Sequence, residues 1–226
     1  MSYAKILWGY FLDILFPPIC LACKAYLVEQ TEKENLLCKA CFDNIPVYKT
    51  VSLGPKFTLV AVSTYDNKAI RELLHAFKYD KFLAAQGPFA SLVDKYLNNV
   101  NLSKILPSDT VIVPIPLHKK RLRERGFNQA EKIADIIGER LGFHINNDTL
   151  IRIKNTPHQT MRKSKEERLN SLRNSFEITD KEAITGKTII LVDDVYTTGA
   201  TMNEASKMLR HAGVKNIIGF VVAKSG

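Results

Sequence analysis

The stretch ILVDDVYTTGATM, residues 190–202, decides how this chain folds. An apolar run ends there in two adjacent carboxylates, Asp193 and Asp194, and a loop of threonines around Gly199 follows at once. Adjacent acids repel each other, but charge-assisted hydrogen bonds from hydroxyl groups of a ligand would offset that repulsion. A loop of small hydroxyl residues with a glycine is typical of phosphate binding, because its N–H groups can surround an anion. A sugar phosphate is a ligand with both features.

Two other classes of protein place acids after an apolar strand, and neither fits this stretch. A nucleotide triphosphatase also needs the pattern G-x4-G-K-[ST], and the near match that ends at residues 183–188 has Lys181 where the first glycine belongs. Its Gly186 also precedes an expected strand rather than a helix. A phosphoacceptor receiver domain would use a strand-end aspartate but would leave the threonine–glycine loop unexplained. The sugar-phosphate interpretation accounts for every residue.

In this interpretation the phosphate lies at the start of a helix, where free N–H groups and the helix dipole favour an anion. The candidate phosphate-binding residues form one loop: Thr197, Thr198, Gly199, Ala200 and Thr201. Gly199 lets the backbone approach the ligand closely, since it has no Cβ. Asp193 and Asp194 lie one short segment earlier and can accept hydrogen bonds from the 2- and 3-hydroxyls of a ribose.

Strand-like and helical stretches alternate from Phe57 onward. Apolar runs at 57–65, 110–116, 187–194 and 216–223 predict strands, and helical apolar spacing at 69–79, 128–143 and 200–213 predicts helices. This alternation is typical of an α/β fold with right-handed βαβ units and a parallel sheet covered on both faces. Ligands bind such sheets beyond the carboxyl ends of the strands. We therefore expect the basic loop LHKKRLRERGF, residues 117–127, to meet the 190–202 stretch, with a loop drawn from residues 152–176 as the candidate for a third.

Residues 152–176 form a long, basic and weakly periodic segment. Inside a compact domain such a segment is usually a lid or another functional loop. A solvated helix over residues 163–172, carrying charge pairs, is the alternative, and the pattern leaves both open.

All four cysteines, Cys20, Cys23, Cys38 and Cys41, lie in one stretch with the spacing C-x2-C-x14-C-x2-C. This spacing is typical of a tetrahedral zinc ion held by two thiolates from each of two knuckles. Two disulfides or idle thiols are the alternative, but nothing else in the sequence indicates an oxidising compartment. Four thiolates leave no ligand position open, so the predicted zinc site is structural. Zinc would supply the folding energy that the polar stretch between the knuckles lacks.

The chain divides into two predicted parts, an N-terminal helix with a zinc-binding module at residues 1–55 and the α/β domain at residues 56–226. The apolar run over residues 1–19 is broken by Asp13, so we expect neither a secretory signal nor a membrane-spanning segment. As a helix, the run would pack against the protein's own core or a partner, with a peripheral membrane contact as the alternative. A cytoplasmic location is expected.

The positive charge is concentrated in one part of the chain. Residues 113–174 hold 14 Lys and Arg against 7 Asp and Glu, so +7 of the net charge of +9 lies there. Such a stretch favours a polyanionic partner. A groove for single-stranded nucleic acid, with Tyr79 and Phe127 as stacking aromatics, and a face that binds pyrophosphate have the same composition, so charge alone does not separate them.

Residues 190–202 resemble the PRPP (5-phosphoribosyl-1-pyrophosphate) signature of type I phosphoribosyltransferases, with four apolar residues, two acids and the threonine–glycine loop. The whole chain resembles the ComF/GntX family. The shared segments are FPPICLAC (16–23), FKYD (77–80), VPIPLHKKRLRERGFNQA (113–130), and TPHQ (156–159) followed by Arg168 and Asn170. The resemblance implies a type I phosphoribosyltransferase-like parallel sheet with flanking helices and a hood segment, plus a small N-terminal zinc module.

The resemblance also implies roles for residues of the PRPP site. The loop Thr197–Thr201 would hold the 5-phosphate, and Asp193 and Asp194 would hold the ribose hydroxyls and stabilise positive charge at the reacting carbon. The loop after Pro116 would hold pyrophosphate, with Arg121, Arg125 and Gly126 as candidates, and Arg162 and Arg168 would close from the hood. Any one of these arginines could instead be a surface charge. Mg²⁺ would bridge pyrophosphate and ribose hydroxyls.

Two functions follow from the resemblance. The first is a PRPP-binding ComF-type protein that handles incoming single-stranded DNA in the cytoplasm during natural transformation, with a partner from the DNA-uptake machinery such as a helicase. The alternative is a Mg-dependent phosphoribosyltransferase that transfers phosphoribosyl from PRPP to a nitrogen acceptor. The zinc module is either a docking surface, with Trp8, Phe11 and Phe16 beside it, or a staple that completes the core of the main domain.

Overall fold

The computed structural model describes Leu15 and residues 17–48, 52–53, 57–79, 86–100, 102, 106–155 and 172–225. Within these residues a six-stranded sheet forms the centre of the molecule, in the order β1-β2-β8-β7-β3-β4. Its strands are β1 (Ser52–Leu53), β2 (Thr58–Thr64), β3 (Thr110–Pro114), β4 (His144–Ile145), β7 (Thr188–Tyr196) and β8 (Asn216–Lys224). Only the short edge strand β1 runs antiparallel to its neighbour; every other pairing in this sheet is parallel. The predicted α/β class with a mostly parallel sheet is confirmed.

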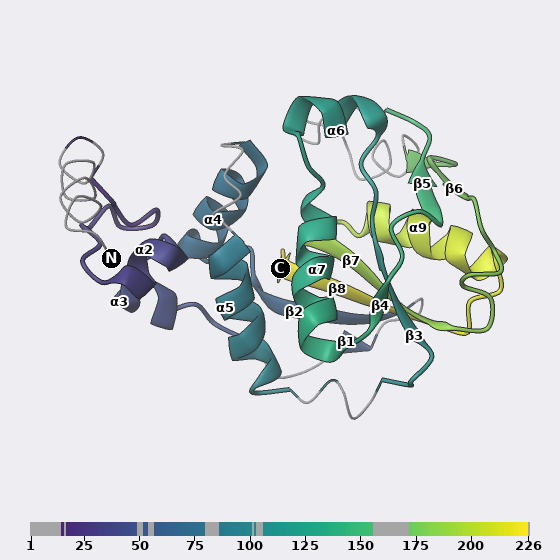
Figure 1. The fold of residues 1–226 in the computed structure, drawn as a ribbon, viewed down its shortest axis with the longest axis horizontal. Helices are drawn as coiled ribbons and strands as arrows, with labels where there is room; N and C mark the ends of the chain where they lie inside the picture. The colour runs from purple at the N-terminus through teal and green to yellow at the C-terminus, as the bar shows by residue number, and fades with distance from the viewer. Residues whose placement is uncertain are drawn as a thin grey trace, which may run out of the picture.

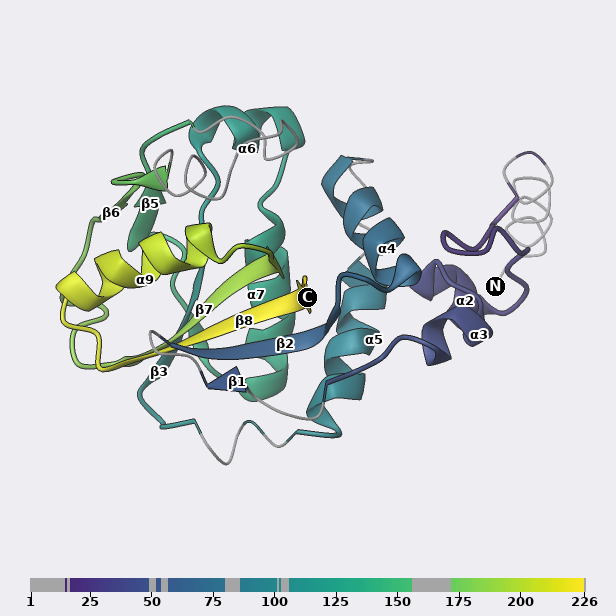
Figure 2. The ribbon, with the colours of Figure 1, turned by 180° about the vertical axis from the view of Figure 1, so that it is seen from behind.

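Helices cover both faces of this sheet (Figures 1 and 2). The helices of the main domain are α4 (Lys68–Tyr79), α5 (Gln86–Leu97), α6 (Lys119–Arg125), α7 (Gln129–Leu141) and α9 (Ala200–His211). On β7, Ile190 and Val192 belong to the buried cluster formed with α4, α5 and α7, whereas Ile189 and Leu191 belong to the cluster on the α9 side. Strand alternation therefore assigns each residue of β7 to one face or the other.

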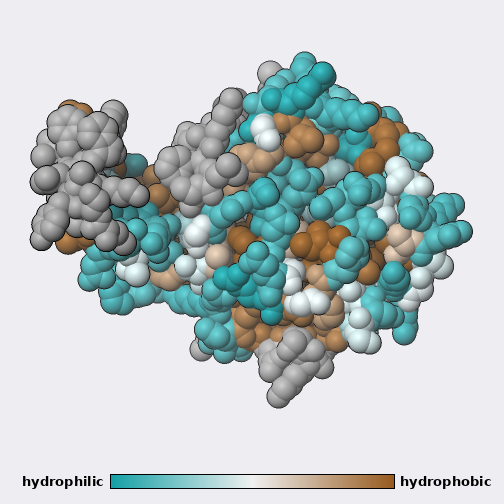
Figure 3. Space-filling model, viewed as in Figure 1, coloured by the Kyte–Doolittle hydropathy of each residue, from teal (hydrophilic) through white to brown (hydrophobic). Residues whose placement is uncertain are grey.

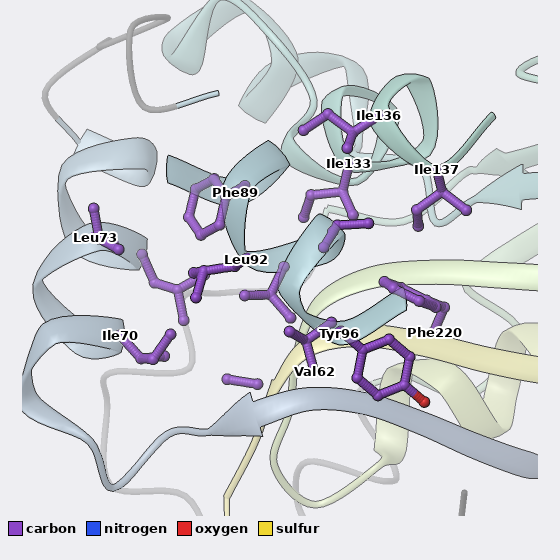
Figure 4. Close-up of a cluster of buried hydrophobic side chains, with 14 of the residues drawn as sticks. Val62, Ile70, Leu73, Phe89, Leu92, Tyr96, Ile133, Ile136, Ile137 and Phe220 are labelled. Carbon is purple, nitrogen blue, oxygen red and sulfur yellow. The ribbon is translucent and has the colours of Figure 1, made fainter. Parts of the chain in front are cut away.

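The larger buried cluster joins three helices to the sheet (Figure 4). The side chains drawn in Figure 4 come from each of these elements: Ile70 and Leu73 from α4, Phe89, Leu92 and Tyr96 from α5, Ile133, Ile136 and Ile137 from α7, and Val62 and Phe220 from the sheet. Apolar spacing alone predicted α4 and α7 at these positions. Burial of side chains of this size is the main stabilising contribution to such a fold.

The ends of α7 follow from local sequence. The side chain of Asn128 accepts a hydrogen bond from the N–H of Ala130 (3.2 Å) and donates to Glu131 (3.0 Å), which confirms the predicted start. Gly142, with φ of 73°, ends the helix in the left-handed conformation that glycine adopts at least cost.

One expected loop is a helix. Residues 119–125, predicted as part of a basic loop, form α6, which begins where Nδ1 of His118 accepts a hydrogen bond from the N–H of Lys120 (3.2 Å) and ends at Gly126. The loop prediction was wrong because Lys, Arg, Leu and Glu all favour helix, and the cap at His118 supplies a start. Figure 3 shows hydrophilic side chains gathered over α6 at the top of the view.

A separate two-stranded antiparallel ribbon, β5 (Leu150–Arg152) and β6 (Phe176–Ile178), lies beside α9. Residues 156–171 between the two strands lie outside the described residues, so the choice between a lid and a solvated helix stays open. In the described part of the chain, no helix combines the length and the apolar character that crossing a membrane requires.

The four-cysteine module packs against α5 of the main domain. It contains α2 (Gln30–Asn35) and α3 (Lys39–Asp43). Its buried residues belong to the same cluster as the core of the main domain: Cys20, Ala22, Leu27, Leu37 and Ile45. Ser91 Oγ donates to Oδ1 of Asn35 (2.9 Å), and Nζ of Lys95 lies 3.2 Å from the carbonyl oxygen of Asp43. The inner face of the module thus completes the core, as the staple interpretation expects.

Candidate functional site

A cavity of about 570 Å³ lies where the carboxyl ends of β3 and β7 meet. Its volume is typical of small-molecule sites. Four parts of the chain line it: the β2–α4 segment, the connection from β3 to α7, Arg152 of β5, and the β7–α9 segment. The expectation that the basic segment after Pro116 meets residues 190–202 is therefore confirmed.

The loop between β7 and α9 forms one wall of the cavity. Thr197, Thr198, Gly199, Ala200 and Thr201 all line it, and α9 begins at Ala200. The first turn of α9 contains no acidic residue, so no carboxylate of that turn compensates the N–H groups and the positive dipole end of the helix start. This wall can accept an anion.

Gly199 is required in this wall for two reasons. Its φ of 72° is in the left-handed region, and a Cβ there would overlap the side chain of Tyr196. The ring of Tyr196 is held in turn against Phe57, with ring centroids 6.3 Å apart.

The acids lie within β7 rather than at its end. The strand was predicted to stop at Asp194, but pairing with β8 extends it to Tyr196. Consecutive strand residues point to opposite faces, so Asp194 shares a face with Ile190 and Val192, and Asp193 shares a face with Leu191. The two carboxylates therefore meet different neighbours although both line the cavity.

Asp194 is paired with a lysine from α4. Its Oδ2 lies 2.5 Å from Nζ of Lys78, and the side chains of Asp194 and Lys78 are only 13% and 25% exposed. Burial lowers the pKa of Lys78, but the adjacent Asp194 carboxylate outweighs burial and raises that pKa above its ordinary value. Lys78 is therefore a fixed positive charge in the wall of the cavity.

The pKa of the other acid, Asp193, is raised above its ordinary value. Burial, and then the charge of Asp194, raise its pKa to about 7, although the N–H of Asp194, Lys78 and Arg152 act in the opposite direction. A carboxyl group with such a pKa changes its charge near neutral pH, which is common in functional sites.

The segment after β3 brings two arginines to the cavity. Arg121 and Arg125 both line it, whereas Gly126 ends α6 and does not. Arg125 donates to Oε1 of the buried Gln129 (2.7 Å), and Nε2 of Gln129 donates to the carbonyl oxygen of Phe77 (3.3 Å). These contacts hold the Arg125 guanidinium at the cavity instead of leaving it as a surface charge.

Asn128 closes the loop that carries these arginines. Its side chain is buried and donates to the carbonyl oxygen of Ile115 (3.0 Å) while it caps α7. The start of this segment after β3, at Ile115, therefore lies next to its end at Asn128, where α7 begins.

The four cysteines lie together in the module. Their sulfur atoms lie within 4.8 Å of one another, and Cys23 Sγ is 3.7 Å from Cys38 Sγ. All four are free thiols, which excludes the predicted alternative of two disulfides in this structure. Four sulfurs at this spacing fit the tetrahedral ligand set of a structural zinc ion.

Known protein families agree with this geometry. Residues 83–226 match the phosphoribosyl transferase domain. The chain belongs to the phosphoribosyltransferase family. Residues 11–51 match the double zinc ribbon domain, which supports a structural zinc ion at the four cysteines of this family member.

Three relatives confirm the resemblance to the ComF/GntX family. Competence protein F of Haemophilus influenzae is 32% identical over 146 residues, 64% of this chain and 63% of that protein. Competence protein ComFC of Bacillus subtilis is 36% identical over 156 residues, with coverage of 68% and 58%. Competence protein ComFC of Streptococcus pneumoniae is 31% identical over 172 residues, with coverage of 73% and 67%. The match to the first two spans about three fifths of their length.

Among the cavity residues to which the sequence assigned no role are two cations, Lys78 and Arg152. Lys78 lies in the FKYD segment shared with ComF/GntX proteins, for which the sequence analysis assigned no role. Arg152 opens the weakly periodic segment 152–176; the structure places its guanidinium carbon 5.4 Å from the centre of the Phe176 ring. Burial, then Arg121, lower the pKa of Arg152 to about 10, while Asp193 raises it. The segment that Arg152 opens was expected to reach the carboxyl ends of the strands, and Arg152 does line the cavity there, but neither residue was singled out by a local pattern.

Among the other predicted residues, one lies beside the core and three fall wholly or partly outside the described part of the chain. Phe127, expected as a stacking aromatic, is half-buried, packs against Phe77 with ring centroids 5.3 Å apart, and does not line the cavity. Its role in stacking on nucleic acid stays a prediction. The side chain of Tyr79 and the candidate hood arginines Arg162 and Arg168 lie outside the described residues.

Proposed function

We propose that this protein binds PRPP in the cavity at the ends of β3 and β7. One observation carries the proposal: a single cavity collects a helix start without acidic residues, two carboxylates and two arginines of the α6 segment. A molecule with a phosphate at one end, a diol in the middle and a diphosphate at the other matches this sequence of groups.

The placement of the ligand follows from the walls. The 5-phosphate lies on the loop Thr197–Thr201, the ribose diol on Asp193 and Asp194, and the diphosphate near Arg121 and Arg125. Arg162 and Arg168 stay predictions as residues that close over it. Mg²⁺ prefers oxygen ligands, which the diphosphate, the diol and Asp193 offer together, and when bound it would neutralise part of the diphosphate charge.

The biological role that we propose is that of a ComF-type protein in natural transformation, which handles incoming single-stranded DNA in the cytoplasm. The names of the relatives, competence protein F and ComFC, support this role. The structure also divides the basic charge of α6: Lys119, Lys120 and Arg123 are exposed and do not line the cavity, unlike Arg121 and Arg125. Separate groups are thus available for DNA phosphates and for PRPP. A helicase or other uptake protein is the proposed partner.

Calorimetric titration of PRPP with Mg²⁺ tests the ligand. The wild type should bind, and the Asp193→Asn/Asp194→Asn variant should lose most of the affinity. Asp109→Asn, an exposed acid just before β3 and so at the opposite end of that strand from the cavity, is the matched control and should bind as the wild type does. Absence of binding by the wild type at millimolar PRPP would contradict the proposal.

Transfer of phosphoribosyl to a nitrogen acceptor is a second candidate. One observation favours it: the cavity extends beyond the proposed PRPP contacts to Tyr65, Leu74 and His75 on the α4 side, which leaves room for an acceptor. Release of pyrophosphate from PRPP that depends on an added base or amide would support turnover, and release at the same rate without acceptors would not.

A further inference from the structure

The α4 wall of the cavity comes from outside the matched phosphoribosyltransferase domain. That match begins at residue 83, whereas α4 ends at Tyr79. The cavity nevertheless includes Lys78, and Nζ of Lys78 contacts Asp194 in the strand that carries the signature acids. A helix that precedes the matched residues therefore reaches the group that we place against the ribose.

The last turn of α4 contacts two parts of the cavity at once. Lys78 holds Asp194 through its side chain, at 2.5 Å. Phe77, the preceding residue, accepts a hydrogen bond from Gln129 through its carbonyl oxygen, and Gln129 accepts one from Arg125. The contact to Asp194 depends on the lysine side chain, whereas the contact toward Arg125 uses only the backbone of α4. Substitution at position 78 can therefore change the first contact and leave the second.

We propose that Lys78 is a positioning residue for the ribose-binding carboxylate Asp194. This inference rests on the proposed PRPP function. Lys78 engages Oδ2 of Asp194, which fixes the rotamer of that side chain and leaves its other oxygen to accept a hydrogen bond from a ribose hydroxyl. Lys78 also places a positive charge next to both carboxylates of the cavity, and Arg125 is a further cation in its surroundings.

A purely structural role would be different. If the ion pair served only to attach α4 to the sheet, its loss would lower the stability of the protein and lower its affinity for all ligands of the cavity alike. If it positions Asp194, its loss weakens ligands that contain the ribose diol and spares those that contain only phosphate. The choice of ligand therefore distinguishes the two roles.

The experiment compares three probes, PRPP with Mg²⁺, ribose 5-phosphate, and inorganic pyrophosphate with Mg²⁺, in calorimetric titrations of the full chain. Lys78→Met removes the charge and keeps much of the length of the side chain. Lys68→Met, at an exposed lysine at the start of the same helix, is the matched control. We expect Lys78→Met to lower the affinity for PRPP and for ribose 5-phosphate by about tenfold to a hundredfold, the usual range when a charged hydrogen-bond partner is removed. Pyrophosphate affinity should stay at the wild-type value.

Lys78→Arg keeps the charge and the donor and should restore most of the affinity for PRPP, which a change of packing would not explain. It also serves if Lys78→Met does not fold, as judged by thermal unfolding. Wild-type binding of PRPP with no difference in Lys78→Met, or an equal loss of pyrophosphate affinity, overturns the inference and leaves the proposed function standing. Failure of the wild type to bind PRPP overturns both.

Discussion

The N–H of Asp194 donates a 2.9 Å hydrogen bond to Oδ1 of Asp193, although strand alternation sends the two side chains to opposite faces of the sheet. The two acids therefore have different partners. Asp194 forms an ion pair with Lys78, whereas Asp193 accepts a hydrogen bond from the backbone. Asp193 keeps a carboxyl group whose pKa is raised by burial and by the charge next to it.

Stability should therefore depend on the ionisation of Asp193. Its pKa is about 7 in the folded chain and about 4 when unfolded, so between these values the folded state binds more protons. Below about pH 4 this carboxyl group is protonated in both states and does not lower the free energy of unfolding. As the pH rises from about 4 to 7, the free energy of unfolding falls, because the unfolded state loses the proton first. Asp193→Asn removes the ionisation. At pH values above 7 its Tm should therefore exceed that of the wild type, by about 2–4 °C for each kcal/mol gained in the free energy of unfolding.

Differential scanning calorimetry at several pH values, from mildly acidic to mildly alkaline, checks this expectation. The Tm difference between Asp193→Asn and wild type should grow with pH. Asp194→Asn is the informative contrast, because it leaves Lys78 half-buried without its carboxylate and should be less stable than wild type. Parallel pH profiles for wild type and Asp193→Asn would contradict the assignment.

Gly199→Ala should damage the phosphate wall more than backbone strain alone explains. The left-handed backbone costs a residue with a Cβ about 1–2 kcal/mol, and at this position the Cβ also meets the Tyr196 ring. Gly142→Ala is the matched control, since Gly142 has a φ of 73° but no atom within 4 Å of an added Cβ. We expect both variants to lose stability in thermal unfolding and only Gly199→Ala to lose PRPP binding in calorimetry. Equal PRPP affinity in the two variants would show that the approach of the backbone at Gly199 is not needed.

Substitutions on two different faces of α6 should affect PRPP binding and DNA binding separately. Arg121→Gln/Arg125→Gln removes two cavity-lining charges, and Lys120→Gln/Arg123→Gln removes two exposed ones, so the change in net charge is the same. The first pair should weaken PRPP binding. The second should weaken binding of a single-stranded oligonucleotide and reduce the salt slope of its affinity by about 0.7 for each phosphate that the protein no longer neutralises. Fluorescence anisotropy across a salt series measures this slope, and an equally reduced DNA affinity in both variants would refute the division.

Removal of zinc should destabilise more than the module. The four thiolates can hold one ion per chain, and Cys20, Leu27 and Ile45 share a buried cluster with α5. Cys23→Ser or a strong chelator should therefore lower the unfolding temperature of the whole chain, because removal of the ion uncovers apolar surface of the main domain. Metal analysis should give one zinc per wild-type chain. Unfolding of the main domain at an unchanged temperature after complete zinc removal would argue against the shared core.

Sequence patterns predicted the parts of this molecule that depend on local chemistry. Apolar periodicity indicated α4 and α7, cysteine spacing indicated the metal cluster, and residues 190–202 indicated a strand, a loop and a helix start in the right order. The predictions that were wrong or missing mostly concern strand pairing and side-chain packing between distant parts of the chain. β7 continues through two acids because β8 pairs with it as far as Lys224, and the partner strand is not visible in the local pattern.

The missed cavity residues have the same cause. Lys78 and Arg152 are cations that sequence reasoning assigns to the surface, since most lysines and arginines are exposed. Only the tertiary fold brings Lys78 to Asp194 and Arg152 into the cavity. The packing of Phe127 against Phe77 likewise depends on the tertiary fold and is not visible in the sequence.

The position of β8 has a consequence for how the chain acquires its function during synthesis. β8 follows all the other strands of the sheet along the chain, yet it lies between β2 and β7 in the middle of the sheet. A chain synthesised only to residue 215 would therefore have two unconnected sheet fragments, with the edges of β2 and β7 both open. Such late, long-range pairing slows folding, and it means that the ligand cavity forms only after β8 has left the ribosome.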